Sequence, residues 1–167
     1  QAFRIGEPAP ALVLPLIGGG TIDLAELRGN PVWVNFMATW CEPCRDEFPL
    51  MSAFQARYED EGLIVLGVDV REDPEVVAAF MDEVGGVFRM ALDADGSAQR
   101  EWGAIALPIH FWIDAEGIIR AVKYGPVSRE EAEELLATII PAVPPSVAPG
   151  SSPAAPPDPR DRVRNLS

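Results

Sequence analysis

The stretch that decides the fold is Val32-Trp33-Val34-Asn35-Phe36-Met37-Ala38-Thr39-Trp40-Cys41-Glu42-Pro43-Cys44, which carries the only two cysteines of the chain. Its first six residues are mostly apolar, β-branched or aromatic, and such a run predicts a buried strand. After Trp40 the pattern changes, because Phe48, Met51, Phe54 and Tyr58 recur at the three- and four-residue spacing of a helix. The two cysteines therefore lie where a strand gives way to a helix.

This position predicts a reactive dithiol. Cys41 falls at or just before the helix N-terminus, and Pro43 is tolerated in the first turn. Unpaired backbone N–H groups and the positive end of the helix dipole favour a thiolate there. Cys44 lies one turn later on the same face, with its sulfur further inside. We expect Cys41 to be the nucleophile and Cys44 to close a disulfide onto it.

Two cysteines at this spacing could also serve three other purposes. A structural zinc site needs four Cys or His ligands, whereas the chain offers two cysteines and the single His110, so we expect no metal. A structural disulfide gains stability by closing a long loop, and this loop is short. Two inert core cysteines would not require a Trp before them or a Glu-Pro between them. Redox chemistry is the favoured interpretation.

Length and charge limit the remaining choices. With 167 residues the chain is long enough for one domain with a real core. Its formal charge of −13 argues against binding to nucleic acid or anionic membranes and suits a partner with a basic or neutral face. No run of about 18 apolar residues is present. Because the chain begins at Gln1 without a methionine, we expect a leader or anchor to precede it.

The other elements are expected in the following order. Residues 11–16 and 21–23 predict a hairpin around three glycines, and residues 24–27 one helical turn capped by Asp23. The dithiol helix should run to about residue 60, with a kink at Pro49. A parallel strand at 63–70 and a helix beginning at Asp73-Pro74 should follow.

The C-terminal half predicts a short strand at 87–92, a short helix at 97–102, and a hairpin of strands 109–113 and 118–122. Ser128 and Glu131 have the spacing of a capping box that opens the last helix. Eight of the seventeen prolines fall between 141 and 159. We therefore expect a folded domain over residues 1–140 and a disordered Pro/Ala/Ser-rich tail over 141–167, a solvated spacer rather than a binding segment.

These motifs resemble those of a known family. The run from Val34 to Cys44, then Glu47-Phe48-Pro49, then Leu107-Pro108 with Phe111-Trp112-Ile113-Asp114 and Gly117, is similar to extracytoplasmic thioredoxin-like thiol–disulfide oxidoreductases of the TlpA/ResA type. The resemblance covers residues 5 to about 140. It implies an α/β thioredoxin-like fold, in which helices flank a central mixed sheet, with an N-terminal hairpin and a central insertion.

The resemblance also assigns roles to residues around the dithiol. It implies that Pro108 is cis and holds the backbone of Leu107 open for a substrate chain. It implies further substrate contacts at Trp40, Glu42 and Pro43. The acidic Glu42 beside Cys41 disfavours the thiolate relative to a basic residue, which argues against a strongly oxidising protein.

Glu47 matches the acidic residue that the family places near its dithiol. Cys44 and Glu47 are three residues apart, so they share a helix face. A carboxylate there can pass a proton to or from the Cys44 thiol. Asn35 stands where thioredoxins proper carry a buried Asp, so proton transfer is expected to move to Glu47. His110 departs from the small or hydroxyl residue expected there, and we interpret it as a strand residue without a role.

The expected function is reduction of disulfides in secreted or membrane-exposed proteins, in cytochrome c maturation or copper-site assembly. The implied partners are apocytochrome c or a copper protein and a membrane thiol-transfer electron donor, with the protein as a monomer that needs no cofactor. The expected location is the periplasm or the outer face of the membrane. Alternatives are a copper-binding or thiol-docking module, a disulfide oxidant or isomerase, and a peroxiredoxin, whose Thr-x-x-Cys pattern is missing because Ala38 stands three before Cys41.

Overall fold

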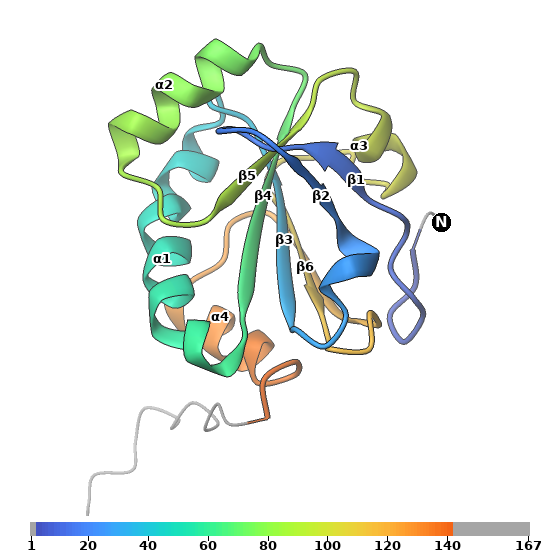
Figure 1. Cartoon of the computed structure of the whole chain (residues 1–167). Coiled ribbons are helices and arrows are strands. Elements are labelled where there is room, and N and C mark those ends of the chain that lie inside the picture. Colours follow the sequence, from blue (N-terminus) through green and yellow to red (C-terminus); the bar gives the residue numbers. More distant parts are fainter. Residues whose placement is uncertain (1–2, 142–167) are drawn as a thin grey trace, which may run out of the picture.

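A mixed five-stranded sheet forms the centre of the protein in the computed structural model, which describes residues 3–141 (Figure 1). The strand order is β5 (Arg89–Asp93), β4 (Ile64–Val70), β3 (Val32–Met37), β6 (Ile109–Ile113) and β7 (Ile119–Tyr124). β3 and β5 pair parallel with β4, whereas β6 pairs antiparallel with β3 and β7. Since all six residues of β3 are buried, the strand that leads to the dithiol runs through the middle of the core.

Helices and a small hairpin cover the two faces of this sheet. On one face lie α1 (Glu42–Tyr58), α2 (Pro74–Val84) and α4 (Arg129–Leu136), as Figure 1 shows. The other face is covered by α3 (Ser97–Glu101), by the hairpin of β1 (Val13–Pro15) and β2 (Thr21–Asp23), and by the 3₁₀ turn η1 (Leu24–Leu27). The expected mixed sheet flanked by helices is confirmed.

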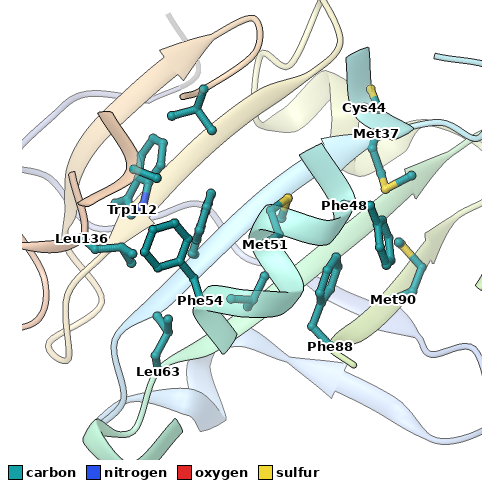
Figure 2. Close-up of a cluster of buried hydrophobic side chains, with 14 of the residues drawn as sticks. Met37, Cys44, Phe48, Met51, Phe54, Leu63, Phe88, Met90, Trp112 and Leu136 are labelled. Carbon is teal, nitrogen blue, oxygen red and sulfur yellow. The ribbon is translucent and has the colours of Figure 1, made fainter. Parts of the chain in front are cut away.

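The core under α1 contains both cysteines. Met37, Phe48, Met51 and Phe54 lie in this cluster, with Cys44 at one end of it (Figure 2). Trp33 of β3 stacks on Trp112 of β6 at 5.3 Å between ring centroids. Aromatic side chains bury a large apolar area and pack in restricted geometries. Trp33 also packs against Phe54, so this stack supports the C-terminal half of the helix that begins at the dithiol.

Several expected elements are confirmed in detail. The N-terminal hairpin forms, and the Asp23 carboxylate accepts a hydrogen bond from the Ala25 N–H at the start of η1. The Ser128–Glu131 capping box is complete in both directions. β6 has the predicted bounds, and β7 is its antiparallel partner. Local sequence signals were sufficient for these elements because caps and turns act within a few residues.

Other boundaries differ from the prediction. The strand expected at 87–92 is Arg89–Asp93, because the buried Asp93 carboxylate accepts the N–H groups of Ala98 and Gln99 and so ties the strand end to α3. α1 ends at Tyr58 and is followed by the 3₁₀ turn η2 (Glu59–Glu61), which ends at Gly62 with φ 84°. Glycine is favoured at a position with positive φ, because it has no Cβ atom to clash with the backbone.

The C-terminal tail lies almost wholly outside the described residues, which end at 141. Within residues 3–141 no helix is both long and apolar enough to span a bilayer.

Candidate active site around the Cys41–Cys44 disulfide

The two cysteines form a disulfide at the N-terminus of α1. Cys41 is the N-cap residue, with extended backbone angles and no side-chain cap, and its Cα lies 5.2 Å from that of Cys44. Cys41 is 5% exposed and Cys44 is 1% exposed. Both sulfur-bearing residues are thus buried, and Cys41 is the slightly more exposed of the two.

The loop between β3 and α1 is held by Glu72, which follows β4. One Glu72 carboxylate oxygen accepts the backbone N–H of Thr39, and the other accepts its hydroxyl, each at 2.6 Å. Such short bonds to a carboxylate are stronger than bonds between neutral groups. Glu72 therefore fixes the residue that stands two positions before Cys41.

A second acid, Asp69, lies buried at the same end of the sheet. It pairs in register with Met37, the last residue of β3, and within residues 3–141 neither of its carboxyl oxygens has a hydrogen-bond partner. Burial, followed by the neighbouring Glu72 carboxylate, raises the pKa of Asp69 to about 8. The protonated form of Asp69 is thus favoured at neutral pH.

The peptide bond between Leu107 and Pro108 is cis, as the resemblance implied. Leu107 packs against the cluster that contains both cysteines, and its backbone N–H and C=O make no hydrogen bond within residues 3–141. A cavity of about 450 Å³ opens beside it, lined at the mouth by Trp40 and Ile105, which are 73% and 86% exposed. An unpaired backbone edge next to exposed apolar side chains is suited to an extended peptide.

Glu47 is 5% exposed, one turn after Cys44 on α1. Its Oε1 accepts the backbone N–H of Val127, and its two oxygens lie 3.2 and 3.0 Å from Nε2 of His110. Glu47 is therefore not a solvated helix acid. It is a buried group whose orientation is fixed by bonds from two distant parts of the chain.

His110 lies in the middle of β6, as expected, and is fully buried. Its Nδ1 lies 3.1 Å from Trp33 Nε1 and 3.2 Å from Asn35 Nδ2, both on β3. Sequence reasoning placed His110 on a strand but found no partner for it. The sequence did carry a signal for this contact, because a histidine inside an otherwise apolar strand needs a polar partner. The acid that α1 buries is Glu47.

Of the remaining predicted site residues, three are exposed and one is buried. Glu42 and Pro43 are exposed in the first turn of α1, next to the exposed Trp40, whereas Pro108 is buried. The structure thus brings together a buried sulfur pair, a buried acid behind it and an exposed apolar rim. A disulfide in this arrangement can exchange with a disulfide or dithiol of a polypeptide. The buried acid can accept the accompanying thiol proton where water does not compete for it.

Comparison with known proteins agrees with this geometry. Residues 5–122 match the sequence model of the AhpC/TSA family. The chain is 33% identical to the thiol-disulfide oxidoreductase ResA of Bacillus thuringiensis subsp. konkukian over 84% of this chain and 82% of the relative. It is also 33% identical to ResA of Bacillus subtilis, over 84% of this chain and 79% of the relative.

Among solved structures, a thiol:disulfide interchange protein of the thioredoxin family from Chlorobium tepidum superposes with a TM-score of 0.72. It is 28% identical to this chain, and the match covers 83% of this chain and 99% of the other. The likeness in sequence, the paired cysteines and the shared fold lead to one conclusion. This chain belongs to the AhpC/TSA family and, within it, to the thiol–disulfide oxidoreductases related to ResA.

Proposed function

We propose that this oxidoreductase works as a reductase of disulfides in secreted or membrane-exposed proteins, and that its substrates are apocytochrome c or a copper-site protein. The observation that carries the proposal is the cavity lined by the exposed Trp40, which directly precedes Cys41, and by Leu107, whose backbone is unpaired within residues 3–141. A small-molecule peroxide needs no such edge, whereas an extended peptide does.

Substrate binding follows from this cavity. The backbone of Leu107 pairs with the substrate chain on one side of its disulfide, and Trp40 and Pro43 contact the substrate side chains. Glu42, exposed in the first turn of α1, adds a negative charge that suits a basic substrate. The formal charge of −13 acts in the same direction over a longer range.

The reaction then proceeds by two exchanges. The Cys41 thiolate attacks one sulfur of the substrate disulfide, a mixed disulfide forms, and the other substrate sulfur leaves as a thiolate. Cys44 loses its proton and attacks the Cys41 sulfur, which releases the second substrate thiol and leaves the Cys41–Cys44 disulfide. Two electrons pass to the substrate, and a thiol donor of lower potential must return them.

Glu47 acts in the second exchange. It shares a helix face with Cys44 and is shielded from water, so its carboxylate accepts the proton that Cys44 must lose. The proposed electron donor is a membrane thiol-transfer protein, and the proposed location is the periplasm or the outer face of the membrane.

Trapping of the mixed disulfide tests this function. The reduced Cys44→Ser chain is mixed with an oxidised peptide that carries the Cys-x-x-Cys-His pattern of haem attachment. We expect an adduct at Cys41, detected by mass after the released peptide thiol has been alkylated, because the resolving thiol of Cys44 is absent. Cys41→Ser is the matched control and should form far less adduct. Equal trapping by both variants, or none by either, would contradict the proposal.

A further inference from the structure

His110 is the single histidine of the chain, and its two ring nitrogens face different partners. Nδ1 faces Trp33 and Asn35 on the neighbouring strand β3, at 3.1 and 3.2 Å. Nε2 faces the Glu47 carboxylate on α1, at 3.0 Å from the nearer oxygen. The imidazole therefore connects the centre of the sheet with the acid next to the dithiol.

These partners determine where the imidazole proton sits. The indole N–H of Trp33 can only donate, so Nδ1 must accept. The Asn35 amide nitrogen also lies 3.3 Å from the Ile109 carbonyl oxygen, which places the donor end of that amide toward His110. With Nδ1 occupied as an acceptor, the ring is neutral and its proton is on Nε2. His110 is then a donor to Glu47 and has no site for a second proton.

The hydrogen-bond donors around Glu47 also indicate the charge state of its carboxyl group. Its carboxyl group receives the Nε2–H of His110 and the backbone N–H of Val127, both donors. These two donors stabilise the carboxylate form of Glu47, and its oxygens keep free lone pairs that can accept a further proton. Lys123 stands opposite His110 on β7, but its ammonium binds Glu131 of α4 at 3.0 Å. Within residues 3–141, the Glu47 carboxylate therefore pairs with no cationic side chain.

We propose that His110 is a positioning residue for the resolving step. It keeps Glu47 deprotonated and aimed along α1, so that Glu47 can take the proton of Cys44. Because Trp33 and Asn35 occupy Nδ1, His110 does not itself take that proton. The inference rests on the proton-accepting role of Glu47 in the proposed function, which it deepens.

Nitrogen NMR of the imidazole tests the tautomer directly. With one histidine in the chain, the ring signals need no assignment by mutation. In the oxidised full chain we expect the neutral Nε2–H pattern, because Nδ1 accepts from Trp33. A neutral Nδ1–H pattern, or the pattern of an imidazolium, would overturn the assignment.

Two substitutions test the role. Gln places an amide N–H near the position of Nε2–H, whereas Leu has similar size and no donor. The rate of mixed-disulfide resolution is measured against pH in His110→Gln and His110→Leu. We expect His110→Leu to slow resolution at least roughly tenfold and to move its pH profile upward, because the carboxylate loses its orientation. His110→Gln should restore most of the rate.

Trapping at Cys41 tests the proposed function, and resolution by Cys44 tests the role of His110. Trapping at Cys41 in the Cys44→Ser chain does not involve the resolving thiol, so adding His110→Leu there should leave the trapping rate within about twofold of the parent. If trapping itself fails, the proposed function is wrong. If trapping succeeds and His110→Leu resolves with an unchanged pH profile, His110 is structural only. Should His110→Leu not fold, a His110→Gln profile unlike the parent's, or the wrong NMR tautomer, would still refute the inference.

Discussion

Glu47 is the side chain on which the proton chemistry of the site depends. It is buried on the same helix face as Cys44, and both hydrogen-bond donors that reach it come from parts of the chain far from α1. A buried carboxylate held in this way is costly without a function, because it gives up hydration for only two bonds. Its value lies in exchanging a proton where water does not compete.

Replacing Glu47 with Gln removes the negative charge of the side chain and keeps nearly the same size and shape. We expect the resolving step to slow by about 10²-fold, because the proton acceptor is lost. The free energy of unfolding should fall by about 1–3 kcal/mol, since the new amide group turns a donor toward Nε2–H or the Val127 N–H. Stopped-flow exchange, thiol titration and thermal unfolding measure these effects. Asp46→Asn, at the exposed neighbouring position, is the control, and thiol pKa values unchanged by Glu47→Gln would refute the role.

Asp69 makes the stability of the protein depend on pH. Its folded pKa of about 8 lies above the ordinary value of 3.8, because burial and then Glu72 disfavour the charged form. Between about pH 4 and pH 8 the native state keeps a proton that the unfolded chain has lost. The free energy of unfolding therefore contains a contribution that is complete below about pH 4 and is lost as the pH rises to about 8.

Asp69→Asn should remove this slope. Relative to the parent, we expect the variant to gain about 1 kcal/mol at pH 8, after allowance for solvent screening, and little at pH 4. Denaturant unfolding at both pH values measures the difference. The exposed Asp73, substituted with Asn in the same way, should show no such pH-dependent gain. A gain for Asp69→Asn that is equal at the two pH values would mean that Asp69 is charged in the native state.

At the scale of elements, the loop between β3 and α1 depends on a side chain from another loop. Glu72 accepts both the N–H and the hydroxyl of Thr39, although the two residues are 33 positions apart. The parallel pairing of β3 with β4 makes this possible, because it brings the two strand ends to the same edge of the sheet. The dithiol is thus positioned by α1 on one side and by Glu72 on the other.

Glu72→Ala should loosen this loop. We expect the free energy of unfolding to fall by about 1–3 kcal/mol, because the Thr39 N–H and hydroxyl lose their acceptor. The Thr39 amide should also exchange its hydrogen faster than the rest of β3. Hydrogen exchange followed by NMR gives both values. Asp60→Ala, at an exposed position in η2, should change stability by no more than about 0.5 kcal/mol. Protection of Thr39 that survives the change would show that Glu72 does not hold the loop.

The sequence predicts elements better than it predicts contacts between them. The strand before Cys41, the helix after it and the capping box at Ser128 follow from local spacing, and all three are present. The Glu47–His110 pair joins residues 63 positions apart. It exists only because β6 runs antiparallel to β3 and places His110 opposite Asn35 under α1. That register is a property of the whole sheet, and no local pattern encodes it.

At the scale of the whole molecule, the sheet order gives the site its character. β3 lies between β4 and β6, so Glu72 binds the loop before Cys41 from the β4 side, and the cis Leu107–Pro108 bond lies just before β6 on the other side. The strongly negative chain, with Glu42 at the mouth of the site, does not favour a thiolate as strongly as a basic surface would. This environment therefore suits an electron donor to disulfides rather than a strong oxidant.

The reduction potential of the Cys41–Cys44 pair tests that claim most directly. The full chain is equilibrated in thiol buffers of known potential, and alkylated cysteines are counted by mass. About 30 mV corresponds to roughly 1.4 kcal/mol for this two-electron couple, so modest precision is enough. We predict a potential well below the glutathione poise, as a reductase requires. A potential well above it would mean that the protein introduces or rearranges disulfides, and the account would be wrong.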